Sequence, residues 1–135
     1  MHKHILIPVA LDHEDLVQRK ITTARKVLDD GGRITLLTIL ESIPGFVNEF
    51  VTIKESNHLS NRVKRALETA AGDASDILTQ VTSGKPGVEV AEFARANAVD
   101  LIIIGSHSPH AKGYALGSTA ARVARRAPCS VLILR

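Results

Sequence analysis

The segment LIIIGSHSPHAKGYALGST, residues 101–119, combines the end of a predicted strand with the start of a predicted helix. An apolar run, LIII, ends at Gly105, and the helical segment that follows opens with Gly117, Ser118 and Thr119. In a parallel sheet this arrangement places free backbone N–H groups at the carboxyl edge, where the positive end of the helix dipole favours a phosphate. The segment therefore predicts an anion site, with a nucleotide as the first candidate ligand.

Short strands and amphipathic helices alternate along the chain. Runs rich in Ile, Val, Leu and Thr predict five strands, at Lys3–Val9, Arg33–Leu40, Leu78–Ser83, Asp100–Gly105 and Ser130–Leu134. All but the third are almost continuously apolar, as expected of strands covered on both faces. The alternation predicts one α/β domain over residues 1–135, with a doubly wound parallel sheet and helices on both faces.

Four helices are predicted from apolar residues that recur at helical spacing. The four stripes are Val17, Ile21, Ala24 and Leu28; Leu59, Val63, Ala66 or Leu67, Ala70, Ala74 and Ile77; Val90, Ala91, Ala94 and Ala98; and Ala120, Val123, Ala124 and Ala127. We interpret Asp29-Asp30-Gly31-Gly32 as a stop and turn after the first helix, and Pro128 as the end of the last. The long connection Glu41–Ser56 predicts a lid or a partner surface.

Composition favours a globular protein without a membrane span. The 135 residues are 44% hydrophobic and 23% charged, and the apolar runs fall well short of the roughly 18 residues of a span. The start, MHKHILIPV, lacks the pattern of a secretory signal, so we expect a cytoplasmic protein. A net charge of +3, three Phe, one Tyr and no Trp argue against nucleic-acid binding. The cluster Arg122, Arg125 and Arg126 is explained by the helix dipole and a solvated face.

Residues 101–134 resemble the C-terminal signature of the universal stress protein family, in which a glycine, a second glycine and a glycine followed by serine or threonine recur at set spacing. Gly105, Ser108, Gly117 and Ser118 take these positions here, and APCSVLILR resembles the closing segment of the family. HILIPV, ITLLTIL and SGKPGVEVAEFARANAVDLIIIGSH extend the resemblance over the whole chain. The resemblance implies the strand order 3-2-1-4-5 and, as in many members, ATP bound where strands one and four part.

The resemblance implies an adenine nucleotide, ATP or AMP, in the crevice beyond the carboxyl ends of these two strands, where the winding direction reverses. It assigns Ala10 and Ile39 to the adenine and Gly105 to the ribose. The phosphates would contact Ser108, Gly117, Ser118 and Thr119. The expected nucleotide-binding residues are Pro8, Val9, Ala10, Asp12, Ile39, Gly105, Ser106, His107, Ser108, Gly117, Ser118 and Thr119. The hydroxyls of Ser118 and Thr119 can donate to phosphate or hold Mg²⁺. Alternatively, Gly117 and Ser118 form an ordinary helix start with no ligand.

Two features depart from the family pattern. Ala10 stands where the family usually has an aspartate that helps hold the nucleoside, and Asp12 follows two positions later. Ser108 replaces the second glycine, and the loop before Gly117 is one residue shorter and contains Pro109, which resembles a subset of the family. Loss of a charge-assisted contact typically costs about 1.5 to 3 kcal/mol. The alternative function is therefore a protein-interaction module that does not bind a nucleotide.

The sequence lacks the signatures of catalysis and of a metal centre. It contains no glycine-framed serine elbow, Walker A motif or HExxH motif, so we expect no catalytic residues and at most slow ATP hydrolysis. His2 and His4 have strand spacing but no third ligand nearby, so we expect no structural metal. His107 is placed to contact a phosphate. The single cysteine, Cys129, is interpreted as buried rather than reactive.

The last strand is apolar and, in the family order, lies at an edge of the sheet. Its residues Val131, Leu132, Ile133 and Leu134 would leave unpaired backbone groups beside hydrophobic side chains. Pairing with the same strand of a second copy would satisfy these groups, and the resemblance likewise implies a twofold dimer. We therefore expect a dimeric, nucleotide-dependent regulator that signals its occupancy to an unidentified protein partner.

Overall fold

The computed structural model describes residues 1–10, 15–41, 53–106 and 116–135. The elements in chain order are β1 (His2–Pro8), α1 (Asp15–Val27), β2 (Leu28–Leu40), α3 (Ile53–Ala71), β3 (Ile77–Ser83), α4 (Pro86–Ala96), β4 (Leu101–Gly105), α5 (Ser118–Arg126) and β5 (Ser130–Leu134). No helix in these ranges is long and apolar enough to cross a membrane.

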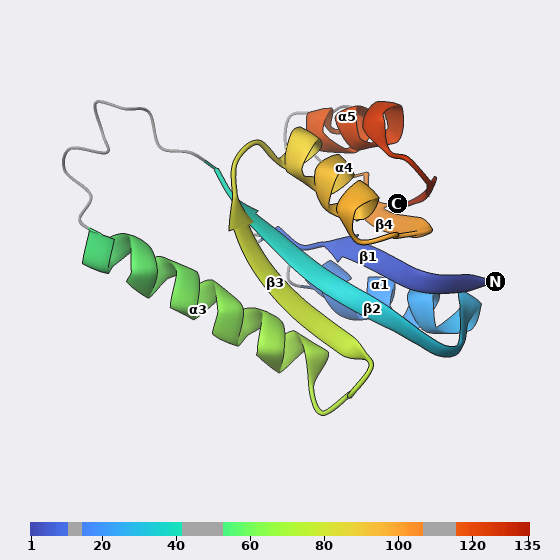
Figure 1. Cartoon of the computed structure of the whole chain (residues 1–135), viewed down its shortest axis with the longest axis horizontal. Coiled ribbons are helices and arrows are strands. Elements are labelled where there is room, and N and C mark those ends of the chain that lie inside the picture. Colours follow the sequence, from blue (N-terminus) through green and yellow to red (C-terminus); the bar gives the residue numbers. More distant parts are fainter. Residues whose placement is uncertain (11–14, 42–52, 107–115) are drawn as a thin grey trace.

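The five strands form one parallel sheet in the order β3-β2-β1-β4-β5. Helices α1 and α3 cover one face, and α4 and α5 cover the other (Figure 1). The predicted fold class and strand order are confirmed. Strand β1 lies at the centre, and its residues Ile5, Leu6 and Ile7 have no exposed surface.

Each face of the sheet has its own hydrophobic core. The core under α1 and α3 contains Ile5, Ile7, Ile34, Leu36 and Ile103 from the strands. The core under α4 and α5 contains Leu6, Leu37, Ile102 and Ile104. Successive side chains of a strand point to opposite faces, so a strand buried on both sides must be apolar throughout. This explains why the apolar runs of β1, β2 and β4 were readable in the sequence.

Strand β2 differs from its prediction. It begins at Leu28, which the periodicity assigned to the first helix, and it contains Asp29–Gly32, which we expected to be a stop and turn. The register of β2 against β1 shifts at this point, so these residues form an irregularity in the ladder. Gly31 has a φ of +79°, which glycine adopts without strain. The turn residues thus bend a strand that continues past them.

The predicted helical stripe of α3 runs too far. The helix ends at Ala71, and the N–H of Gly72 donates to the carbonyl of Glu68 at 3.0 Å. Ala74 and Ile77, expected in the helix, lie in the following turn and at the start of β3. Ala74 and Ile77 pack against the core under α3. The turn and the start of β3 therefore continue the apolar spacing of the helix after the helix itself has ended. At the other end, the helix begins at Ile53, inside the connection predicted over Glu41–Ser56, and residues 42–52 lie outside the described ranges.

Three other residues of the stripes do not belong to the core. Leu59 in α3 is 44% exposed, and Ala124 in α5 is also exposed. Ala98 follows the end of α4 with a φ of +52° and points to solvent, while the next residue, Val99, is buried instead. The apolar spacing therefore identifies the buried face of each helix, but it also includes residues that the structure leaves exposed.

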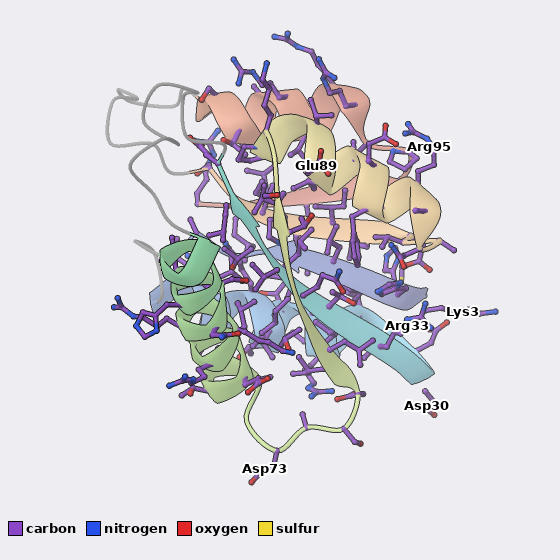
Figure 2. The ribbon with its side chains drawn as sticks, turned by 60° about the vertical axis from the view of Figure 1, so that its left-hand side comes forward. Lys3, Asp30, Arg33, Asp73, Glu89 and Arg95 are labelled. Atoms are coloured by element: carbon purple, nitrogen blue, oxygen red, sulfur yellow. The ribbon has the colours of Figure 1, made fainter. Side chains whose placement is uncertain are left out.

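The amino edge of the sheet is closed by polar contacts. A carboxylate oxygen of Asp100, just before β4, accepts from the backbone N–H of Lys3 at 2.8 Å, and the N–H of Asp100 donates to the carbonyl of His4 at 3.0 Å. Figure 2 shows Lys3, Arg33 and the end of α4 at Arg95 along one side of the molecule. Charged groups and backbone hydrogen bonds thus occupy the amino edge of the sheet.

His4 connects three segments beneath this edge. The residue is 5% exposed, and its Nδ1 donates to the carbonyl of Asn97 at 2.9 Å. The Nε2 atom accepts from the hydroxyl of Thr35 at 2.8 Å, which assigns the ring proton to Nδ1 because a carbonyl can only accept. Burial lowers the pKa of His4, against the opposing effect of the Asn97 carbonyl. The neutral ring therefore fits this position and the charged ring does not.

The protein should lose stability as the pH falls through the range in which free histidine takes up a proton. Below the ordinary pKa of 6.5, the unfolded chain binds a proton at His4 that the folded protein resists, so acid favours unfolding. One such group contributes at most about 1.4 kcal/mol per pH unit. Urea denaturation at about pH 7.5 and pH 5.5 should show a smaller pH effect in His4→Gln. His58→Gln, an exposed position on α3, is the control, and an equal pH effect in both variants would contradict the prediction.

Candidate functional site

The candidate site lies at the carboxyl ends of β1 and β4. The chain leaves β1 for α1 on one face of the sheet and leaves β4 for α5 on the other (Figure 1). In a parallel sheet, a reversal of winding leaves the ends of the two adjacent strands without a crossover between them. The strand order places this reversal between β1 and β4, as the sequence predicted.

The β1 side of the site is held in place by β2. Val9 is 8% exposed, and its N–H donates to the carbonyl of Leu37 at 2.8 Å. The carbonyl of Val9 accepts from the buried hydroxyl of Thr38 at 2.9 Å. Pro8 ends the strand partly buried, and Ala10 is exposed. The backbone is therefore fixed up to Val9, and Ala10 offers a ligand no polar side chain.

The β4 side is closed by backbone hydrogen bonds. The N–H of Ser106, directly after Gly105, donates to the carbonyl of Leu134 in β5 at 2.9 Å. The N–H of Gly117 donates to the carbonyl of Ser106 at 3.1 Å. The two ends of the signature segment are thus adjacent, and the start of α5 lies beside the end of β4.

Helix α5 begins without a side-chain cap. Gly117 occupies the N-cap position with a φ of −62° and a ψ of 155°, and the first turn contains no acidic residue. Ser118 is the first helical residue and is exposed, while Thr119 is partly buried. The interpretation of this segment as an ordinary helix start without a ligand assumed a serine cap. The N-cap residue in the structure is glycine instead. The backbone N–H groups of this first turn are those that an anion would meet.

The structure places the remaining predicted residues as follows. Ile39 lies near the end of β2, partly buried against the core under α4 and α5. Asp12, His107 and Ser108 lie outside the described residues. The expected dimer residues Val131–Leu134 form most of β5, which is an outer strand of the sheet, and they are partly buried. Their position at an edge agrees with the expectation, and their pairing with a second copy stays a prediction.

Sequence reasoning missed Lys20. This lysine lies on α1, is 5% exposed, and its Nζ donates to the carbonyl of Pro8 at 3.4 Å. The signal was present in the sequence, since Lys20 lies three residues after Val17 and directly before Ile21 on the apolar side of the helix. A cation on that side of the helix is brought under the carboxyl end of β1.

The described residues contain no group of three His, Cys, Asp or Glu side chains close enough to hold a metal ion. Of the two histidines at strand spacing, His4 is occupied by Thr35 and the carbonyl of Asn97. Cys129 is partly buried, and burial raises the pKa of its thiol. A thiol in that state is a poor nucleophile at neutral pH, in line with its interpretation as a packing residue.

Comparison with known proteins identifies the family. The sequence model of the universal stress protein family matches residues 1–135. The chain belongs to the universal stress protein family. Universal stress protein G of Shigella flexneri is 31% identical over 144 residues, which cover 100% of both chains. The predicted family membership is confirmed.

Solved structures of universal stress proteins share the fold. The protein UspA from Lactobacillus plantarum has a TM-score of 0.71 and 25% identity, covering 98% of this chain and 97% of its own. A universal stress protein in complex with cAMP has a TM-score of 0.66 and 20% identity, with 99% and 97% coverage. A universal stress protein from Archaeoglobus fulgidus in complex with dAMP has a TM-score of 0.64 and 15% identity, with 97% and 96% coverage.

Adding a methyl group at Gly105 should leave the fold intact, whereas the same change at Gly87 should not. A Cβ at Gly105 would lie 3.6 Å from Cδ1 of Leu16, an ordinary contact, but a Cβ at Gly87 in α4 would lie 2.8 Å from Cβ of Arg122 in α5. Urea denaturation should show Gly105→Ala within about 0.5 kcal/mol of wild type and Gly87→Ala destabilised by about 1 to 3 kcal/mol. Equal destabilisation of the two variants would refute this account of the site's packing.

Proposed function

We propose that this protein binds an adenine nucleotide, ATP or AMP, at the carboxyl ends of β1 and β4 and acts as a dimeric nucleotide-dependent regulator in the cytoplasm. The observation that carries the proposal is the uncapped start of α5, held beside the end of β4 by the Gly117 to Ser106 hydrogen bond of 3.1 Å. The complexes of two related structures with cAMP and dAMP support an adenine nucleotide as the ligand.

The physical basis is the preference of a helix start for anions. The first-turn N–H groups of α5 have no carbonyl partner within the helix, and the helix dipole adds positive potential at the same place. Gly117 has no side chain to stand between these amides and a phosphate. Mg²⁺ is the expected companion of ATP, with the hydroxyls of Ser118 and Thr119 as the groups nearest to the phosphates in this proposal.

A regulatory role follows from the connection between the site and the sheet edge. Ser106 belongs to the site and donates to Leu134 in β5 at 2.9 Å, and β5 is the strand that we propose pairs with a second copy. A nucleotide that favours one arrangement of the signature segment would thereby shift the population of states at the edge strand. The partner protein would detect occupancy through that change, without turnover of the nucleotide.

One observation favours the alternative function. Ala10 is exposed at the mouth of the site and has no charged group, whereas a nucleoside is usually oriented by polar side chains. A protein-interaction module that does not bind a nucleotide would tolerate such a residue. The alternative is therefore decided by whether the wild-type protein binds ATP or AMP at all.

Replacing Gly117 with valine should weaken nucleotide binding. A branched side chain at the N-cap would occupy the space between the amides of α5 and a phosphate, and loss of such contacts costs about tenfold in affinity or more. Isothermal titration of ATP, AMP and GTP in the presence of Mg²⁺ measures this directly. The control Ala124→Val changes an exposed residue of the same helix and should bind as wild type does. No binding by the wild-type protein would favour the interaction module.

Charge on the edge strand should separate the dimer. Ile133 lies partly buried in β5, and Ile133→Lys would place an ammonium group beside the same strand of the second copy. Sedimentation analysis should give the mass of a monomer. Leu78→Lys makes the same kind of change on β3, the opposite edge strand, where Leu78 is 49% exposed, and should keep the dimer. A folded Ile133→Lys protein with the mass of the dimer would disprove pairing through β5.

A further inference from the structure

Lys20 is buried, and among the side chains that the structure describes no carboxylate is paired with its ammonium group. Among the residues that the structure describes, it is the one lysine or arginine classed with the buried side chains, at 5% exposure. Its neighbours on the same side of α1 are the apolar residues Val17, Ile21 and Ala24. Burial lowers the pKa of Lys20, as expected for an ammonium group removed from water.

The contacts of the ammonium group are insufficient for its charge. Lysine has three donors, and the hydrogen bond that the structure gives is the one to the carbonyl of Pro8, at 3.4 Å. Among the side chains that the structure describes, no carboxylate forms an ion pair with it, whereas the exposed cations Arg25 and Arg95 are paired with Asp76 and Glu92. An unpaired buried charge is destabilising, so an apolar side chain of the same length would be more stable here.

The place of the Lys20 ammonium group in the fold suggests why a charged side chain is buried here. The Nζ atom lies 3.4 Å from the carbonyl of Pro8, at the end of β1, and 3.7 Å from the point where a Cβ on Gly105, at the end of β4, would lie. These are the two strand ends that the reversal of winding leaves open. Gly105 precedes Ser106, whose carbonyl holds the N–H of Gly117 at the start of α5. The ammonium group thus lies at the carboxyl ends of β1 and β4, and the start of α5 lies beside the end of β4.

We propose that Lys20 is a ligand-binding residue whose ammonium group contacts a phosphate oxygen of the nucleotide at the ends of β1 and β4. The inference rests on the proposed function, since it takes the ligand to be a nucleotide. It adds that the site selects phosphorylated nucleotides over the free nucleoside, with one contribution from the amides of α5 and a second from a side chain of α1. The missing partner of the buried charge is then the ligand itself.

The inference is tested with AMP and adenosine, two ligands that differ in one phosphate. Isothermal titrations use the full chain as wild type, Lys20→Met and Lys20→Gln. Methionine matches the length of the lysine stem without its charge, and glutamine keeps a polar end. The control Lys26→Met removes an exposed cation from the same helix. Both Lys20 variants should bind AMP about tenfold or more weakly than wild type, and their affinity for adenosine should change less than twofold.

The outcomes separate this inference from the proposed function. If wild type binds neither AMP here nor ATP in the titrations described above, the proposed function is wrong and the role of Lys20 falls with it. If wild type binds AMP and both Lys20 variants bind it equally well, the inference alone is overturned. Equal losses for AMP and adenosine would also overturn it, because a residue that only shapes the site affects both ligands.

Thermal denaturation without ligand gives an independent readout. Since no described carboxylate is paired with the buried ammonium group, Lys20→Met should melt at a higher temperature than wild type, and Lys26→Met should not. A gain in stability with a loss of AMP affinity is the pattern of a residue retained for binding. A lower melting temperature for Lys20→Met would show that the lysine serves the fold, and would count against the inference.

Discussion

The reversal of winding between β1 and β4 determines where the candidate site lies in this fold. All strands are parallel, so their carboxyl ends share one edge, and the crossovers from β1 and β4 leave that edge toward opposite faces. At the amino edge, Asp100 and His4 tie the strands together with hydrogen bonds. Hydrogen bonds within the protein therefore hold the amino edge. The carboxyl ends of β1 and β4 lie beside the start of α5, which has no side-chain cap, and beside the buried Lys20.

Much of the fold was readable because the sheet is buried on both faces. The apolar runs of β1, β2 and β4 are typical of strands covered on both faces, and their alternation with helical stripes leaves few topologies. The errors occurred where one element continues the apolar spacing of another. Leu28 and Ile77 fit the helical period but begin strands, since strand and helix draw on the same residue types. The irregularity in β2 depends on how this strand pairs with β1. The local sequence of β2 does not contain that information.

The candidate site was predictable in its backbone and not in its side chains. Glycine spacing and the expected strand order located the ends of β1, β4 and α5, because they depend on turns and topology. Lys20 and Thr38 were not predicted as site residues because each lies within an apolar pattern, and only the packed structure shows that both are buried beside the site. Whether a lysine such as Lys20 is exposed or buried depends on how its helix packs against the ends of the neighbouring strands.

The close approach of α4 to α5 has a mechanical consequence. At Gly87 the two helices are so near that no space remains for a methyl group against Arg122. Helices packed this closely cannot slide past each other freely, so a shift of α5 would be passed to α4. A displacement at the start of α5 would therefore also change the position of the outer surface of α4.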